Sequence, residues 1–105
     1  MSRFLLVFTG GGMPETPEEQ EAVMAAWGKW YQDLGEAIAD PGNPLGEAKN
    51  IAEGAVTAGA VSSPPASGFT ILSADSMDAA VEMAQGCPML DGDNGQVTVY
   101  EAMEM

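Results

Sequence analysis

The first third of the chain constrains the fold most, because an apolar run there leads into a long amphipathic helix. Residues 3–9 are rich in β-branched and aromatic side chains and too few to span a bilayer, so they predict a strand buried on both faces. After a glycine loop, Thr16, Pro17 and Glu19 supply an N-cap, a proline at the first helical position and a capping-box glutamate. We therefore expect a helix that begins at Pro17.

The apolar residues that follow recur at three- and four-residue steps, which is the spacing of one helix face. This set comprises Val23, Trp27, Trp30 or Tyr31, Leu34 and Ile38. Charged residues fall elsewhere on the helix, so the pattern predicts that the apolar face lies on a sheet.

A second strand and a hairpin are predicted in the middle of the chain. Prolines and glycines in residues 39–46 should end the first helix and turn the chain. Residues 45–53 alternate weakly between apolar and polar side chains and predict an edge strand. Glu53-Gly54 should form its turn, and residues 55–61 should continue as an irregular hairpin arm before a loop at 62–67.

Two further strands and a short helix complete the predicted fold. Residues 68–74 and 96–102 have the composition and alternation of strands. Between them Asp75 should cap a short helix, which Gly86 and Pro88 should end. The order β-α-β-β-α-β in one domain, residues 1–105, predicts an α+β fold of the ferredoxin-like kind, with both helices on one face of an antiparallel sheet.

Charge and missing residue types exclude several classes of function. The formal net charge is −13, with sixteen carboxylates against Arg3, Lys29 and Lys49, so we expect no nucleic acid or membrane partner. The chain has no histidine and one cysteine, so it lacks the commonest metal ligand and general base and cannot form an intrachain disulfide. No transmembrane stretch or signal-peptide pattern is present, and we expect a cytoplasmic protein.

Several short segments, taken together and in order, resemble the YCII-related domain family over nearly the whole chain. They are Phe4-Leu-Leu-Val-Phe8, residues 10–19, Trp27-Gly28-Lys29-Trp30, Leu34-Gly35, Gly42-Asn-Pro-Leu-Gly46, Lys49, Asp78-Ala-Ala80 and Gly86-Cys-Pro88. The resemblance implies a ferredoxin-like chain that pairs into a dimeric α/β barrel. Some members of that family carry a proposed histidine and aspartate active-site pair, and many carry an Asp-Gly-Pro-Phe motif where this chain has Ser63-Pro64-Pro65-Ala66. With no histidine to fill that role, no catalytic residue can be named.

Five residues form the candidate ligand-binding set: Trp30, Tyr31, Asp40, Asn43 and Lys49. Trp27, Trp30 and Tyr31 lie within two helical turns, so at most two rings can point fully into one core and the third can line a cleft or an edge. Lys49 follows the turn at 40–46 and suits an anionic ligand or a carboxylate partner. Simple packing of the rings and surface pairing of Lys49 are the structural alternatives.

Three other patterns predict structure rather than chemistry. Residues 10–12 have neither a Walker lysine nor a dinucleotide fingerprint, so we expect a glycine loop without a phosphate. Cys87 follows the end of a helix and has no histidine to activate it, so we expect a buried structural thiol. Residues 91–95 begin like a calcium loop, but Gln96 and Ala102 stand where glycine and glutamate are required. We therefore expect neither a metal nor a cofactor.

Two hypotheses about function follow from these patterns. The first is a small-molecule-binding homodimer, or an enzyme of unknown reaction, with a cleft near the sheet, the glycine loop and the turn at 40–46. The second is a structural or interaction module without a ligand, and a cofactor-independent oxygenase is a third by fold analogy alone. A homodimer is expected because the strands carry apolar residues at both parities, so a lone sheet would expose a large apolar face.

Overall fold

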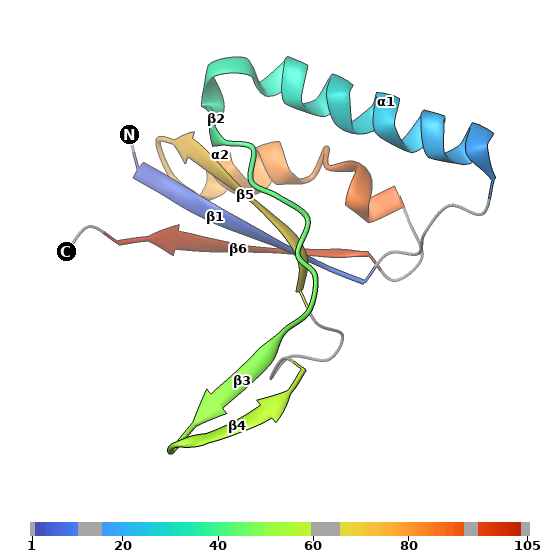
Figure 1. The fold of residues 1–105 in the computed structure, drawn as a ribbon. Helices are drawn as coiled ribbons and strands as arrows, with labels where there is room; N and C mark the ends of the chain where they lie inside the picture. Colours follow the sequence, from blue (N-terminus) through green and yellow to red (C-terminus); the bar gives the residue numbers. More distant parts are fainter. Residues whose placement is uncertain (1, 11–15, 60–65, 92–94, 104–105) are drawn as a thin grey trace.

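Four antiparallel strands form the main sheet in the computed structural model, which describes residues 2–10, 16–59, 66–91 and 95–103. The strand order across the sheet is β2-β5-β1-β6. These strands are β1 (Ser2–Thr9), β2 (Ile38–Asp40), β5 (Ala66–Ala74) and β6 (Gln96–Ala102). The helices α1 (Pro17–Leu34) and α2 (Met77–Ala84) lie together over one face of the sheet (Figure 1). The fold is therefore α+β with an antiparallel sheet and two helices, which is compatible with the ferredoxin-like plan.

The core lies between the helices and the face of the sheet beneath them. Alternate residues of β1, namely Phe4, Leu6 and Phe8, are buried there, as the pleat of a strand requires. The opposing strand β5 contributes Thr70, Leu72 and Ala74, and the helices contribute Trp30, Ala80 and Ala84. Cys87 is also buried in this cluster, which agrees with the structural role expected for it.

The other face of the sheet has no cover from the described part of the chain, and we refer to it as the open face. Its apolar residues are Leu5, Val7, Phe69, Ile71 and Tyr100, which the strand registers place side by side. Tyr100 is 55% exposed and the other four side chains are half-buried. The expectation that the first strand is buried on both faces is therefore wrong within a single chain, where only one face is buried.

The start of α1 follows from its sequence. Thr16 is the N-cap, and its hydroxyl oxygen accepts a hydrogen bond of 3.1 Å from the backbone N–H of Glu19. Pro17 occupies the first turn, where its missing N–H costs no helical hydrogen bond. The predicted cap and first residue of the helix are confirmed.

The end of α1 differs from the prediction. Gly35, with φ of 53°, ends the helix after Leu34, and a short 3₁₀ turn η1 (Gly35–Ala37) leads into β2. Ile38 therefore lies on a strand rather than on the apolar face of the helix, and Val23 is 41% exposed instead of packed on the sheet. Because β2 has only three residues, no sequence periodicity could identify it.

The predicted edge strand at 45–53 is wrong in its place in the fold. Residues 49–52 and 55–58 form β3 (Lys49–Ala52) and β4 (Ala55–Ala58), which pair only with each other as a second sheet. The turn between them is at Glu53 and Gly54, as predicted, and both have positive φ, the signature of a two-residue hairpin turn. This hairpin, here called the arm, extends away from the helices (Figure 1).

The short helix α2 also begins and ends differently from the prediction. Its N-cap is Ser76, one residue after the predicted Asp75, and the Ser76 hydroxyl oxygen accepts the N–H of Ala79 at 3.1 Å. Gly86 does not adopt a positive φ, so it is not the left-handed residue that was expected. Pro88 begins a 3₁₀ turn, η2 (Pro88–Asp91). No helix in the described residues is both long and apolar enough to cross a membrane.

Candidate ligand-binding cleft

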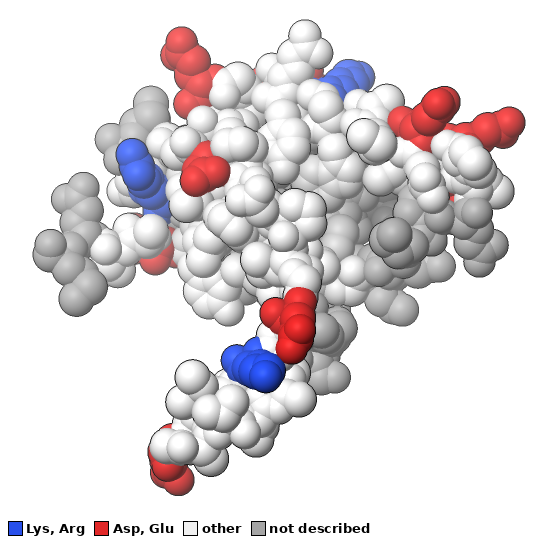
Figure 2. Space-filling model, viewed as in Figure 1, with Lys and Arg blue, Asp and Glu red and all other residues white. Residues whose placement is uncertain are grey.

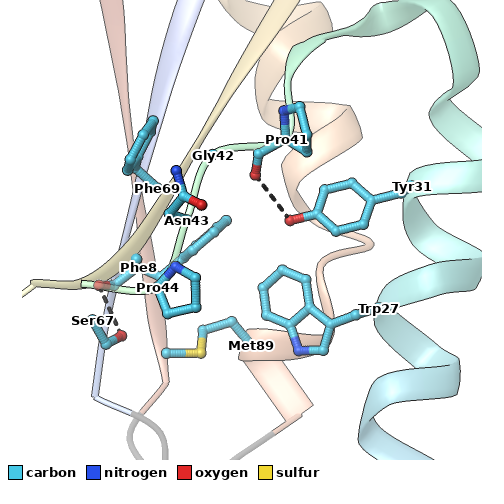
Figure 3. A pocket seen from close by; sticks show the side chains of 11 residues that line it. Phe8, Trp27, Tyr31, Pro41, Gly42, Asn43, Pro44, Ser67, Phe69 and Met89 are labelled. Carbon is cyan, nitrogen blue, oxygen red and sulfur yellow. Dashed lines mark hydrogen bonds between the residues drawn. The ribbon is translucent and has the colours of Figure 1, made fainter. Parts of the chain in front are cut away.

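A cleft of about 380 Å³ lies beside the core, where α1 faces the segment of chain that follows β2. We refer to this segment, residues 41–44, as the strap. Figure 3 shows Trp27 and Tyr31 projecting from α1 toward the strap, with Met89 of η2 at one end of the cleft. Phe8 of β1 and residues 67–69 of β5 complete the described lining. The volume falls within the roughly 300–1,000 Å³ that small-molecule sites usually occupy.

The aromatic wall of the cleft comes from two residues one helical turn apart. The ring centroids of Trp27 and Tyr31 are 5.9 Å apart and their planes are inclined by 36°. Phe8 braces this wall from the sheet, since its ring meets Trp27 edge to face with centroids 5.2 Å apart. The two rings of α1 therefore form a continuous surface rather than a closed cage.

The strap is held against β5 by backbone contacts. The Phe69 N–H donates to the Asn43 carbonyl oxygen at 3.3 Å, and the Leu45 N–H donates to the Ser67 carbonyl oxygen at 2.9 Å. Gly42 has φ of 73°, and a Cβ at this position would overlap the Phe69 carbonyl oxygen. Glycine is thus required at position 42 by both its backbone conformation and the close approach of β5.

Hydrogen bonds also tie the strap to α1 and the sheet. The Pro41 carbonyl oxygen accepts from the hydroxyls of Thr70 at 3.0 Å and Tyr31 at 3.3 Å, and these two hydroxyl oxygens are 3.2 Å apart. Thr70 is completely buried, and this network satisfies its hydroxyl. Tyr31 therefore has two roles: its ring lines the cleft and its hydroxyl fixes the strap across from it.

Two of the five predicted site residues line the cleft. Tyr31 and Asn43 are both part of its wall. Asp40 is not in the lining, and its Oδ1 instead accepts the Gly42 N–H at 2.8 Å, which shapes the start of the strap. Asp40 thus positions the site without facing it.

The other two predicted site residues lie elsewhere. Trp30 is 6% exposed and belongs to the core, where its Nε1–H donates to the Met83 carbonyl oxygen at 3.0 Å. Lys49 is an exposed residue of β3 on the arm and does not line the cleft. Neither residue is therefore part of the described lining of this cleft.

Sequence reasoning did not assign several lining residues to the site, namely Phe8, Trp27, Pro41, Pro44, Ser67, Phe69 and Met89. The spacing of the three rings of α1 did show that one of them could line a cleft, but not which one. Apart from Tyr31, the other residues of the cleft come from segments 14 to 62 residues distant from Trp27 on the chain, and no local pattern reports such contacts. Two predicted loop patterns, at residues 10–12 and 91–95, fall mostly outside the described residues.

The described lining is apolar, with a few hydrogen-bonding groups. It contains no carboxylate and no cationic side chain. Lys29 lies on the exposed side of α1, Arg3 is on β1 and Lys49 is on the arm, so all three cations of the chain are outside the lining. Among the residues that the structure describes, no group of three histidine, cysteine, aspartate or glutamate side chains could hold a metal ion.

A second hollow, of about 350 Å³, lies between α2 and β6 and is more open to solvent. Met77, Val81, Leu90, Val97 and Val99 supply most of its surface. It has no aromatic wall, and its described lining includes only Gln85 and Thr98 as polar side chains. The cleft under the strap is therefore the stronger candidate site.

No protein-family model matches the sequence, and no curated protein is similar to it at a significant level.

Proposed function

We propose that this protein is a small-molecule-binding homodimer whose ligand enters the cleft between α1 and the strap. The observation that carries the proposal is the cleft itself: an aromatic wall, a strap fixed on the opposite side, and a few polar groups between them. Small-molecule sites are typically concave and apolar, with a small number of placed hydrogen-bonding groups.

The lining supports binding more than catalysis. General acid–base catalysis needs a titratable group near the substrate, most often histidine or a carboxylate, and the chain has no histidine. The polar side-chain groups of the described lining are the hydroxyls of Tyr31 and Ser67, the carboxamide of Asn43 and the indole N–H of Trp27. The Ser67 hydroxyl already donates to the Phe8 carbonyl oxygen at 3.1 Å, so it is a structural group rather than a nucleophile.

The open face is the surface through which we propose that two copies of the chain pair. The residues of β1, β5 and β6 that point to this face are Arg3, Leu5, Val7, Thr9, Phe69, Ile71, Ser73, Gln96, Thr98, Tyr100 and Ala102, and none of them is acidic. At the edge of the sheet, the register pairs Asp40 of β2 with Ile71. The chain has sixteen carboxylates, so their absence from the part of this face that β1, β5 and β6 form is a strong bias. Charged residues are depleted from the centre of protein interfaces, and a second copy of the chain would cover this face through a two-fold axis.

The arm offers a second surface of the same kind. No residue of β3 or β4 is acidic. Two large apolar side chains of the arm are exposed to solvent, since Ile51 is 72% exposed and Val56 is 61% exposed. An isolated two-stranded hairpin is only marginally stable in water, so the arm needs a contact beyond its own chain. The radius of gyration, 14.9 Å, exceeds the roughly 13 Å of a compact domain of this length, which is consistent with a chain shaped for a partner.

The surface outside the open face and the arm also supports the proposed homodimer. In the view of Figure 2, acidic side chains are scattered around the body, and only a few basic ones are visible. We also propose that the chain is related to the YCII-related domain family. It would then have a ferredoxin-like topology and pair as a dimeric α/β barrel. This relationship rests on the sequence resemblance and on an α+β chain whose sheet has one uncovered face.

A thermal-shift screen of uncharged and charged metabolites tests the binding function. A ligand that binds only the native state must raise the melting temperature, and Trp27→Ala should abolish that rise. Met24→Ala is the matched control, because Met24 is on the same helix and 74% exposed. If no compound raises the melting temperature, or if Trp27→Ala leaves every rise unchanged, the cleft is not the site.

Sedimentation equilibrium across a salt series tests the homodimer. Charge repulsion between two acidic chains is screened over about 8 Å at physiological ionic strength, so the dimer should tighten as salt is raised. Leu5→Glu should weaken the dimer by placing a carboxylate on the open face, and Met24→Glu should not. A monomer at micromolar concentration in high salt would contradict this interface.

A further inference from the structure

The distribution of charge around the cleft restricts its ligand. All three cations of the chain lie outside the lining, and the segments of the chain that the structure does not describe contain no lysine or arginine. A phosphate or carboxylate in the cleft would therefore meet no cationic side chain from its own protomer. The net charge of −13 adds a field that repels anions, so an anionic ligand is disfavoured.

A cationic ligand is also poorly matched to this lining. The Asp40 carboxylate is the nearest acidic group in the sequence to the strap, and its Oδ1 is engaged by the Gly42 N–H. Burying a charge without a counter-charge is costly. A single aromatic face attracts a cation by only about 0.5–1 kcal/mol at an exposed site, and Trp27 and Tyr31 form one wall at 36° rather than a cage.

The shape of the cleft favours a flat ligand. The wall formed by Trp27 and Tyr31 stands opposite the prolines at the two ends of the strap, Pro41 and Pro44 (Figure 3). A planar ring inserted between these walls would lie on the aromatic side chains and contact the prolines with its other side. Such stacking is favourable for an uncharged ring and requires no specific heteroatom.

The Asn43 carboxamide is a polar group of the lining that remains available to read the edge of such a ring. The Asn43 carboxamide makes no hydrogen bond with any described residue, although the backbone of Asn43 is fixed to β5. A carboxamide offers an acceptor and two donors side by side, which pair with an amide or lactam edge through two parallel hydrogen bonds. Its partner on the ligand is thus a carbonyl beside an N–H.

Taking the proposed binding function as its basis, we propose that the cleft is specific for an uncharged planar molecule that carries an amide or lactam edge. The ring stacks on Trp27 and Tyr31, and the amide edge pairs with the Asn43 carboxamide.

Three probes of nearly the same size and shape separate the possible ligand charges. Benzamide is neutral and has the amide edge, benzoate is the anion, and benzamidine is a cation at neutral pH. Titration of each into ¹⁵N-labelled protein is followed at the two indole N–H signals, which Trp30→Phe assigns. Trp27 lines the cleft and Trp30 donates to Met83 in the core, so the second indole is an internal control.

Benzamide should shift the Trp27 signal saturably, leave the Trp30 signal in place, and bind about tenfold more tightly than either charged probe. Asn43→Leu, which keeps the size of the side chain, should weaken benzamide about tenfold by removing the paired hydrogen bonds. Equal or tighter binding of benzoate or benzamidine at Trp27, or unchanged benzamide binding in Asn43→Leu, would overturn the ligand class and leave the cleft as a site. Absence of a saturable Trp27 shift with all three probes would count against the cleft itself, and so against the proposed function.

Discussion

Trp30 and Trp27 are three residues apart on α1, yet one belongs to the core and the other to a cleft. Trp30 is 6% exposed and lies against α2, to which its indole N–H is bonded through the Met83 carbonyl. Trp27 is half-buried and faces the strap. The difference arises because α2 has only 8 residues against the 18 of α1, so the second helix covers only part of the first.

The sheet beneath the two tryptophans also differs between the core and the cleft. On its helix-facing side β5 presents Leu72 and Ala74 in the core, but Gly68 and Thr70 nearer the cleft. A Cβ at Gly68 would lie only 3.4 Å from both the Asn43 carbonyl oxygen and the Phe8 ring. The cleft thus forms where the helical layer ends and the strand has its smallest residue. This comparison shows that a single amphipathic helix supplies both a core and a binding wall.

The largest effect on stability is expected for Trp30, the tryptophan in the core. Trp30→Ala removes a buried indole and should lower the free energy of unfolding by about 3–5 kcal/mol. Trp30→Phe keeps most of the packing and should cost less, which provides a folded variant for comparison. Urea titration measures the free energy of unfolding of both variants, and the slope of the transition should stay unchanged. A loss under about 1 kcal/mol for Trp30→Ala would show that this ring is not part of the core.

Trp27→Ala should destabilise the protein less than Trp30→Ala, because the indole at 27 is already half-exposed. We expect a loss of about 1–3 kcal/mol, in proportion to the smaller apolar area that leaves water on folding. The same variant should lose ligand binding while Trp30→Phe retains it. If the two tryptophan variants exchange these behaviours, the division of α1 into a core part and a cleft part is wrong.

Thr16→Ala tests the end of α1 nearer to Trp27. Removal of the hydroxyl that accepts the Glu19 N–H should cost about 0.5–2 kcal/mol. Thr16→Ser, which keeps the accepting oxygen, is the matched control and should retain most of that stability. An unchanged urea midpoint at unchanged slope in Thr16→Ala would remove the cap from this account.

Tyr31→Phe should have the smallest effect on stability, and it tests whether the Tyr31 hydroxyl fixes the strap. The change keeps the ring in the cleft wall but removes the hydroxyl that contacts Pro41 and Thr70. The loss should be about 0.5–1.5 kcal/mol, the usual net contribution of one hydrogen bond. Hydrogen exchange should quicken at the Phe69 amide, which is bonded to the strap, more than at Leu72 in the core. Equal changes at both amides would mean that Tyr31 does not fix the strap.

Much of the fold was predictable from the sequence because local chemistry determines it. The cap at Thr16, the hairpin turn at Glu53 and Gly54, and the strand at 96–102 each have a signature within a few residues. The strand at 38–40 was missed because three residues cannot display a period, and Gly35 ended the helix inside an apolar pattern that continued to Ile38. The arm was placed in the main sheet because alternation does not identify the strand's partner.

The candidate site was predictable only in part. Helical spacing shows that Trp27, Trp30 and Tyr31 share a face, but the one that is buried depends on Met83, which is 53 residues beyond Trp30. Tyr31 was identified from the helical spacing of the aromatic rings, and Asn43 from its place in the predicted turn at 40–46. Lys49 was included because cations are scarce, yet the hairpin carries it away from the cleft.

Crystals of the protein soaked with a library of small fragments test the central claim most directly. Uncharged planar fragments should gather between the Trp27 and Tyr31 rings and the strap, with amide groups at Asn43. Fragments that gather instead in the hollow between α2 and β6, or that leave the cleft empty at concentrations where other surfaces are occupied, would contradict it.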